Sequence, residues 1–87
     1  MKLIPSPHFH KDLRGLDPQT QERLRRKLKL LLRDKMHFSI RYKTVYALKS
    51  ENPPSEQISI TMSIRVTLQE FNDHIYPRNI GGHNILP

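Results

Sequence analysis

Residues 58–69 read Ile-Ser-Ile-Thr-Met-Ser-Ile-Arg-Val-Thr-Leu-Gln, and this stretch decides the fold of the chain. Apolar side chains alternate with polar ones throughout it, which is the pattern of a β-strand with one buried face and one solvated face. The run from Ile58 to Leu68 is long for a single strand in a small domain. A reversal near Met62-Ser63 would divide it into a hairpin, and the alternation alone allows either arrangement.

Two helices are predicted before this stretch. Ser6 and Asp17 each offer a side-chain oxygen as an N-cap, and each is followed by a proline at the first helical position. The first helix is expected to stop at Gly15. The second is predicted over residues 18–33, where leucines recur at helical spacing. The short link between the helices, at Leu16-Asp17, predicts that they fold back as a hairpin.

The residues after the second helix favour strands. Residues 42–47 are rich in β formers, and residues 51–55 form a loop because they contain two prolines. A last strand is expected over residues 74–80, after a turn at Asn72-Asp73. The sequence therefore predicts one α+β domain over residues 1–87, with two N-terminal helices packed on an antiparallel sheet.

Composition limits the classes of function. The formal net charge is +7, from 15 Lys and Arg against 8 Asp and Glu. This surplus favours a polyanionic partner such as a nucleic acid over a merely solvated basic surface or a surface for an acidic protein. The absence of cysteine excludes disulfides and zinc ribbons. Without an apolar run of about 20 residues or a signal peptide, we expect a cytoplasmic protein that does not enter a membrane.

Histidine and arginine are the candidates for chemistry. RNA cleavage through its own 2′-hydroxyl needs a proton acceptor, a proton donor and cations that stabilise the phosphorane. His83 follows a glycine turn, Arg65 lies on the polar face of the predicted strand, and Arg78 precedes His83 by five residues. We predict these three residues as the catalytic set. The alternatives are a surface histidine and a solvated arginine paired with a carboxylate.

Further residues are candidates for RNA binding. Arg41 and Lys43 would contact phosphates, and Tyr42 and Tyr46 would stack on bases. Lys27 belongs to the basic face of the second helix, which is either solvated or in contact with phosphate. We expect no metal and no cofactor. His8 and His10, two residues apart on a helix, point to different sides, and carboxylates are not clustered.

The order of these segments resembles the RelE/ParE toxin superfamily of bacterial type II toxin–antitoxin systems. The resemblance spans nearly the whole chain, through the first helix, the basic leucine-rich second helix, residues 56–68 and the ending at residues 79–86. That ending is similar to the Ile-Gly-Thr-His-Asp type of RelE- and YafQ-like members. The resemblance implies two helices on a curved antiparallel sheet of the microbial ribonuclease kind, with a break near Met62-Ser63.

The resemblance also implies a function. It implies ribosome-dependent cleavage of mRNA without a metal, and neutralisation by a cognate antitoxin. Arg65 matches the family's strand arginine that binds phosphate, and His83 matches the catalytic histidine of YafQ-like members. Arg41, Lys43 and Arg78 are further carry-overs from the family.

The chain departs from the family at three positions. Pro77 replaces an aliphatic residue and predicts an edge or a bulge in the last strand, because it removes a ladder donor. Gly82 and Asn84 replace a threonine and an acidic residue beside the histidine. These departures favour one alternative, a non-catalytic binding module. The other alternative is a ParE-like inhibitor of DNA gyrase.

Overall fold

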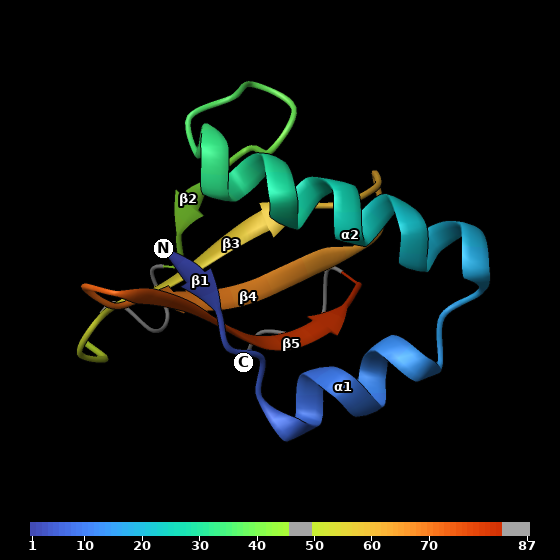
Figure 1. Ribbon diagram of the computed structural model, residues 1–87, viewed down its shortest axis with the longest axis horizontal. Coiled ribbons are helices and arrows are strands. Elements are labelled where there is room, and N and C mark those ends of the chain that lie inside the picture. The colour runs from blue at the N-terminus through green and yellow to red at the C-terminus, as the bar shows by residue number, and fades with distance from the viewer. Residues whose placement is uncertain (46–49, 83–87) are drawn as a thin grey trace.

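Two helices cover a five-stranded sheet in the computed structural model, which describes residues 1–45 and 50–82 (Figure 1). The sheet order is β1-β5-β4-β3-β2. This arrangement confirms the predicted α+β fold with helices packed on a sheet. The elements are β1 (Lys2–Leu3), α1 (Pro7–Arg14), α2 (Pro18–Arg33), β2 (Lys43–Thr44), β3 (Ser55–Ser59), β4 (Arg65–Glu70) and β5 (His74–Gly81).

The alternating stretch is a hairpin. β3 and β4 pair antiparallel, with Ser59 opposite Arg65, and the chain reverses between them. This confirms the break near Met62-Ser63. The prediction of a wholly antiparallel sheet needs one correction, because β1 pairs parallel with β5 and the sheet is mixed. The short N-terminal segment covers the outer edge of β5, where the Ile4 N–H donates to the Ile75 carbonyl at 3.0 Å.

A β-bulge lies where Pro77 predicted an irregularity. Thr67 opposes Asn79, while the next residue, Leu68, opposes Pro77, so Arg78 is the extra residue on β5. Strict alternation would place Pro77 and Ile80 on opposite faces of the sheet. The extra residue returns them to the same side, and both are buried. The bulge therefore keeps the two ends of β5 packed on one core.

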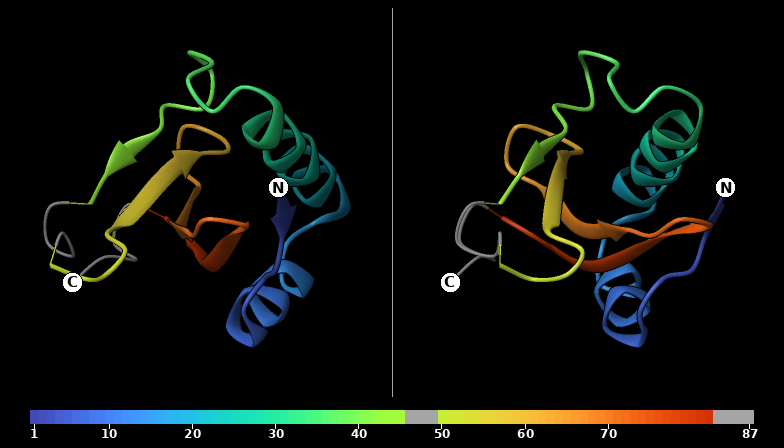
Figure 2. Two further views of the ribbon diagram at one scale, coloured as in Figure 1. Left: turned by 60° about the vertical axis from the view of Figure 1, so that its left-hand side comes forward. Right: turned by 90° about the vertical axis from the view of Figure 1, so that its left-hand side faces the viewer.

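Both helices begin after their predicted N-caps, and their bounds agree with the prediction. The Ser6 hydroxyl accepts the Phe9 N–H at 3.0 Å, the Asp17 carboxylate accepts the Thr20 N–H at 3.4 Å, and Gly15 ends α1. The chain reverses between the helices, as the predicted hairpin requires, but the two helices run apart from each other (Figure 1). α1 lies beside β5, whereas α2 crosses over the face of the sheet (Figures 1 and 2). No helix among the described residues is long and apolar enough to cross a membrane.

The core lies between α2 and one face of the sheet. Leucines on one side of α2 pack against alternate residues of the strands, and each fully buried side chain of this size stabilises the fold by about 1.5–3 kcal/mol. The core residues are Phe9, Leu24, Leu28, Leu31, Ile40, Ile58, Ile60, Val66, Leu68, Ile75 and Ile80. The intervening strand residues, which face the other way, include Ser59 and Arg65.

Candidate functional site

A basic cavity of about 550 Å³ lies between α2, the loop that follows it and the β3–β4 turn. Four cationic side chains line it, Arg23, Lys27, Arg41 and Arg65, and we call the cavity the basic pocket. None of its described lining residues carries a carboxylate. The other lining residues are Phe38, Ser39, Ser59, Ile60, Thr61 and Met62.

Helix α2 contributes two of the cations through its periodicity. Arg23 and Lys27 are four residues apart, so they lie on the same side of the helix, next to the buried Leu24 and Leu28. The Lys27 ammonium is partly buried and donates to the Ser39 carbonyl at 2.7 Å. Burial, followed by the positive charges of Arg23 and Arg41, lowers the pKa of Lys27 below its ordinary value. Both causes act against the charged form of Lys27, and the two arginines add to the effect of burial.

Arg41 enters the pocket from a left-handed backbone position. Its φ is 53°, a conformation that costs a residue other than glycine about 1–2 kcal/mol. The preceding residue, Ile40, is fully buried, and its carbonyl accepts the Ser59 N–H at 2.8 Å. This anchor holds the loop against the end of β3. The left-handed turn follows directly and redirects the chain toward β2, with Arg41 exposed at the pocket.

Arg65 is held by the turn that precedes it. Its Nη1 donates to the carbonyl oxygens of Thr61 at 2.9 Å, Met62 at 3.2 Å and Ile64 at 3.4 Å. Within residues 1–45 and 50–82, no carboxylate lies within 4.0 Å of Arg65, and only Nη1 among its nitrogens makes a side-chain hydrogen bond. The alternative of a carboxylate-paired arginine therefore finds no support in this part of the chain.

The end of β5 reaches the same region. Gly81 is paired with Arg65 across the β4–β5 ladder. A Cβ added to Gly82, which follows, would lie 3.5 Å from the Ser63 carbonyl oxygen. The last described residue therefore lies at the β3–β4 turn. His83, Asn84 and Tyr46 lie outside the described residues.

Arg78 and Lys43 lie away from the basic pocket. Nη1 of Arg78 donates to Glu51 Oε2 at 2.7 Å and to the Ser55 hydroxyl at 3.0 Å. This arginine therefore already has a carboxylate partner. Lys43 is exposed on β2 opposite Gln57 and does not line the pocket.

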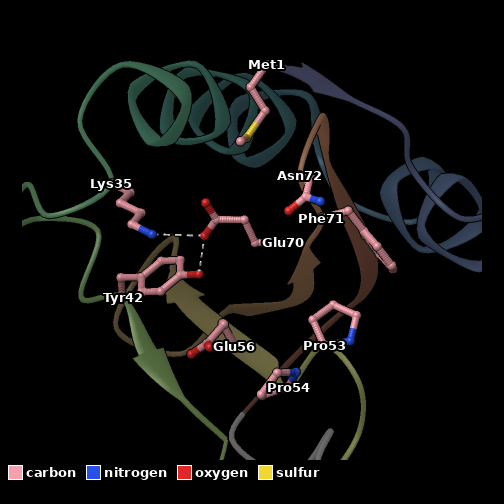
Figure 3. A pocket seen from close by; sticks show the side chains of 9 residues that line it. All are labelled: Met1, Lys35, Tyr42, Pro53, Pro54, Glu56, Glu70, Phe71 and Asn72. Atoms are coloured by element: carbon pink, nitrogen blue, oxygen red, sulfur yellow. Dashed lines mark hydrogen bonds and ion pairs between the residues drawn. The ribbon is translucent and has the colours of Figure 1, made fainter.

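Tyr42 belongs to a second cavity, of about 410 Å³, at the other end of the β3–β4 hairpin (Figure 3). Its hydroxyl donates to Glu70 Oε2 at 2.9 Å, and Lys35 donates to the same oxygen at 3.0 Å. Burial, followed by the bond to Glu70, raises the pKa of Tyr42. Glu56 and Glu70 line this cavity against one cation, Lys35, so its lining does not favour phosphate as that of the basic pocket does. Tyr42 therefore lines a different cavity from Arg41 and Lys27.

Sequence reasoning did not include Arg23 or Phe38 among the site residues, although both line the basic pocket. Arg23 belongs to the basic run of α2, and its four-residue spacing from Lys27 is the signal that could have singled it out. Phe38 follows the helix in a loop, and nothing in the sequence distinguishes it from a core residue. Among the described residues, no group of three or more His, Cys, Asp or Glu side chains is placed to hold a metal ion.

Comparison with known proteins places this geometry in a structural class. No family model and no curated protein sequence matches the chain. A YoeB dimer from Staphylococcus aureus is similar in structure, with a TM-score of 0.74 and 15% identity over 95% of this chain and 97% of that chain. The chain has the fold of RelE-like toxins.

Two further solved structures agree. RelE in a RelB–RelE antitoxin–toxin complex from Methanococcus jannaschii has a TM-score of 0.70 and 14% identity, over 92% of this chain and 89% of that chain. A DinJ–YafQ complex from E. coli has a TM-score of 0.71 and 11% identity, over 95% of this chain and 92% of that chain. The fold implied by the resemblance is therefore confirmed, whereas the RelE-like activity remains a matter for proposal.

Proposed function

We propose that this chain is the toxin of a type II toxin–antitoxin system and that it binds and cleaves mRNA on the ribosome. One observation carries the proposal. Four cationic side chains meet in one pocket of a RelE-like fold, and no described lining residue neutralises them. Phosphate is the ligand that suits such a pocket, because guanidinium groups grip phosphate with paired hydrogen bonds and an ammonium contributes a point charge.

The pocket residues take distinct roles in the proposal. Arg23, Lys27 and Arg41 hold phosphates along the strand, and Arg65 contacts the scissile phosphate. The substrate's 2′-oxygen forms a bond to phosphorus while the bond from phosphorus to the 5′-oxygen breaks. A general base takes the 2′ proton, and a general acid protonates the 5′-oxygen. His83 is the predicted group for one of these transfers, and the last described residue before it lies at the β3–β4 turn near Arg65.

Arg78 has a smaller part in this proposal than the sequence predicted. Its contact with Glu51 would have to open before it could stabilise charge on a phosphate. Arg65 keeps nitrogens that make no hydrogen bond within the described residues, so we assign stabilisation of the phosphorane to Arg65.

The proposed partners follow from charge and from the structural neighbours. The RelE and YafQ structures are complexes with antitoxins, which supports a cognate antitoxin for this chain. The net charge of +7 favours association with the ribosome, whose surface is anionic. We place the protein in the cytoplasm, where ribosomes and mRNA are found.

Induced expression with primer extension on cellular mRNA tests the proposal. We expect the wild-type chain to arrest growth and produce new mRNA 5′ ends, and His83→Ala and Arg65→Ala to lose both effects. Arg25→Ala is the matched control, since Arg25 is exposed on α2 and does not line the basic pocket. Arrest with DNA damage and intact mRNA would instead indicate a ParE-like gyrase inhibitor. Absence of arrest would indicate a non-catalytic binding module.

A further inference from the structure

Phe38 is an exposed aromatic ring at the edge of the basic pocket. It is 85% exposed and lines the cavity together with the four cations. Its ring stacks on the ring of His37, with centroids 4.8 Å apart and planes 22° from parallel. His37 is itself positioned, because its Nδ1 accepts the Ser39 N–H at 3.2 Å and lies 2.9 Å from the Ser39 hydroxyl. Phe38 is therefore supported from within the loop, and most of its surface is open to solvent.

The surroundings of Phe38 point to a ligand. A single exposed apolar side chain is ordinary on a protein surface. Phe38, however, adjoins cations that have no carboxylate among the described lining residues, and Met62, 91% exposed, lines the same cavity from the β3–β4 turn. An aromatic ring beside phosphate-binding cations is how proteins hold single-stranded nucleic acid, since bases stack on the ring while the backbone follows the charges.

We propose that Phe38 is a stacking platform for one unpaired base of an RNA strand whose phosphates occupy the basic pocket, with Met62 against the edge of that base. This inference rests on the proposed function and adds the form of the substrate to it. The bases of a duplex are stacked on one another and cannot reach the ring, so the site selects unpaired RNA. Stacking tolerates every base, and the platform by itself confers no sequence preference.

Binding assays separate the platform from the phosphate contacts. The probe is a short labelled single-stranded RNA, compared with its duplex and with an analogue of the same strand that lacks bases. In the full chain carrying His83→Ala, which leaves the probe intact, we expect Phe38→Ala to weaken binding of the single strand about tenfold. Binding of the duplex and of the abasic strand should not change. Met36→Ala is the matched control, because Met36 is 74% exposed in the same loop but does not line the pocket.

A fluorescent variant tests the stacking directly. The chain has no tryptophan, so Phe38→Trp introduces a single reporter. We expect this variant to bind the single strand as well as the parent does, with fluorescence quenched by the single strand and unchanged by the abasic strand. Equal single-strand affinity of Phe38→Ala and its parent, or unquenched tryptophan in the bound complex, would overturn the inference.

These outcomes are distinct from those of the proposed function. Phe38-dependent binding in a chain that cleaves no mRNA would support the platform and contradict the nuclease. Cleavage that persists with full efficiency in Phe38→Ala would support the nuclease and contradict the platform. If Phe38→Ala weakens antitoxin binding and leaves RNA affinity unchanged, the ring is a protein contact and the platform is wrong.

Discussion

The Lys27 ammonium on α2 donates a hydrogen bond to the carbonyl oxygen of Ser39 over 2.7 Å. This contact joins the helix to the loop that carries Phe38 and Arg41. It also holds a positive charge where burial and two neighbouring arginines lower the pKa of Lys27. A bound phosphate would offset that repulsion, so an anionic ligand would favour the charged form of Lys27.

Replacing Lys27 should reveal a phosphate contact. We expect Lys27→Met to weaken RNA binding and to lower the slope of log affinity against log salt by roughly 0.7, the value for one phosphate contact with a single strand. Fluorescence anisotropy over a salt series measures both quantities. Lys29→Met is the matched control, because it removes the same charge from an exposed position of α2 outside the pocket. Equal slopes for the two variants would contradict the assignment.

Arg65 should contribute to stability as well as to binding. Its three bonds to carbonyl oxygens hold the β3–β4 turn, so we expect Arg65→Ala to lower the free energy of unfolding by about 1–2 kcal/mol. Urea denaturation measures this loss, and Arg65→Lys should recover part of it by keeping one charged donor. An unchanged midpoint of urea unfolding in Arg65→Ala would show that the side chain does not stabilise the β3–β4 turn. The activity of Arg65 variants must be judged against this structural effect.

Arg78 and Glu51 should be coupled to each other. Both side chains are 31% exposed, and Arg78 Nη1 lies 2.7 Å from Glu51 Oε2. The same nitrogen also donates to the hydroxyl of the buried Ser55. We expect a double-mutant cycle with Arg78→Ala and Glu51→Ala to give a coupling energy of about 1 kcal/mol in urea denaturation. RNA affinity should be the same in Arg78→Ala as in the wild type. A large loss of RNA affinity in Arg78→Ala, with no coupling energy between Arg78 and Glu51, would indicate that Arg78 binds RNA.

Local signals in the sequence predicted most of the elements. The oxygen-bearing caps before Pro7 and Pro18 determined where both helices begin, since capping depends on residues a few positions apart. Pro77 predicted the bulge because a missing donor disrupts a ladder at its own position. The parallel pairing of β1 with β5 depends on residues more than 70 positions apart, and a two-residue strand carries no periodicity that could reveal it.

The candidate site was predicted only in part for the same reason. Three predicted residues, Lys27, Arg41 and Arg65, meet in the basic pocket, because the fold brings α2, the loop that follows it and the β3–β4 turn together. Tyr42 and Arg78 lie elsewhere, because each is bound to a carboxylate. Tyr42 bonds to Glu70 and Arg78 bonds to Glu51, and both contacts arise from the tertiary structure. Neither contact can be derived from spacing along the chain.

Glu70 should make stability depend on acid pH. Burial alone would raise the pKa of its carboxyl, but the hydrogen bonds from Lys35 and Tyr42 outweigh burial, and the pKa lies below its ordinary value of 4.5. A carboxyl whose pKa is lower in the folded state stabilises the fold above its unfolded pKa and loses that contribution as pH falls through the folded pKa. We therefore expect the wild type to be more stable than Glu70→Gln near neutral pH and the difference to shrink below about pH 4.5.

The comparison with Glu70→Gln is needed because other carboxyls act in the same range. Hydrogen bonds from Thr20 and His74 lower the pKa of Asp17 and Asp73, so the wild-type chain loses stability in acid for several reasons. The difference between the wild type and Glu70→Gln, measured by urea denaturation at each pH, isolates the contribution of Glu70. Glu22→Gln removes one exposed negative charge and serves as the control. If the difference for Glu70→Gln stays constant from neutral to acid pH, the carboxylate contributes through packing alone and the ionised network in Figure 3 does not stabilise the fold.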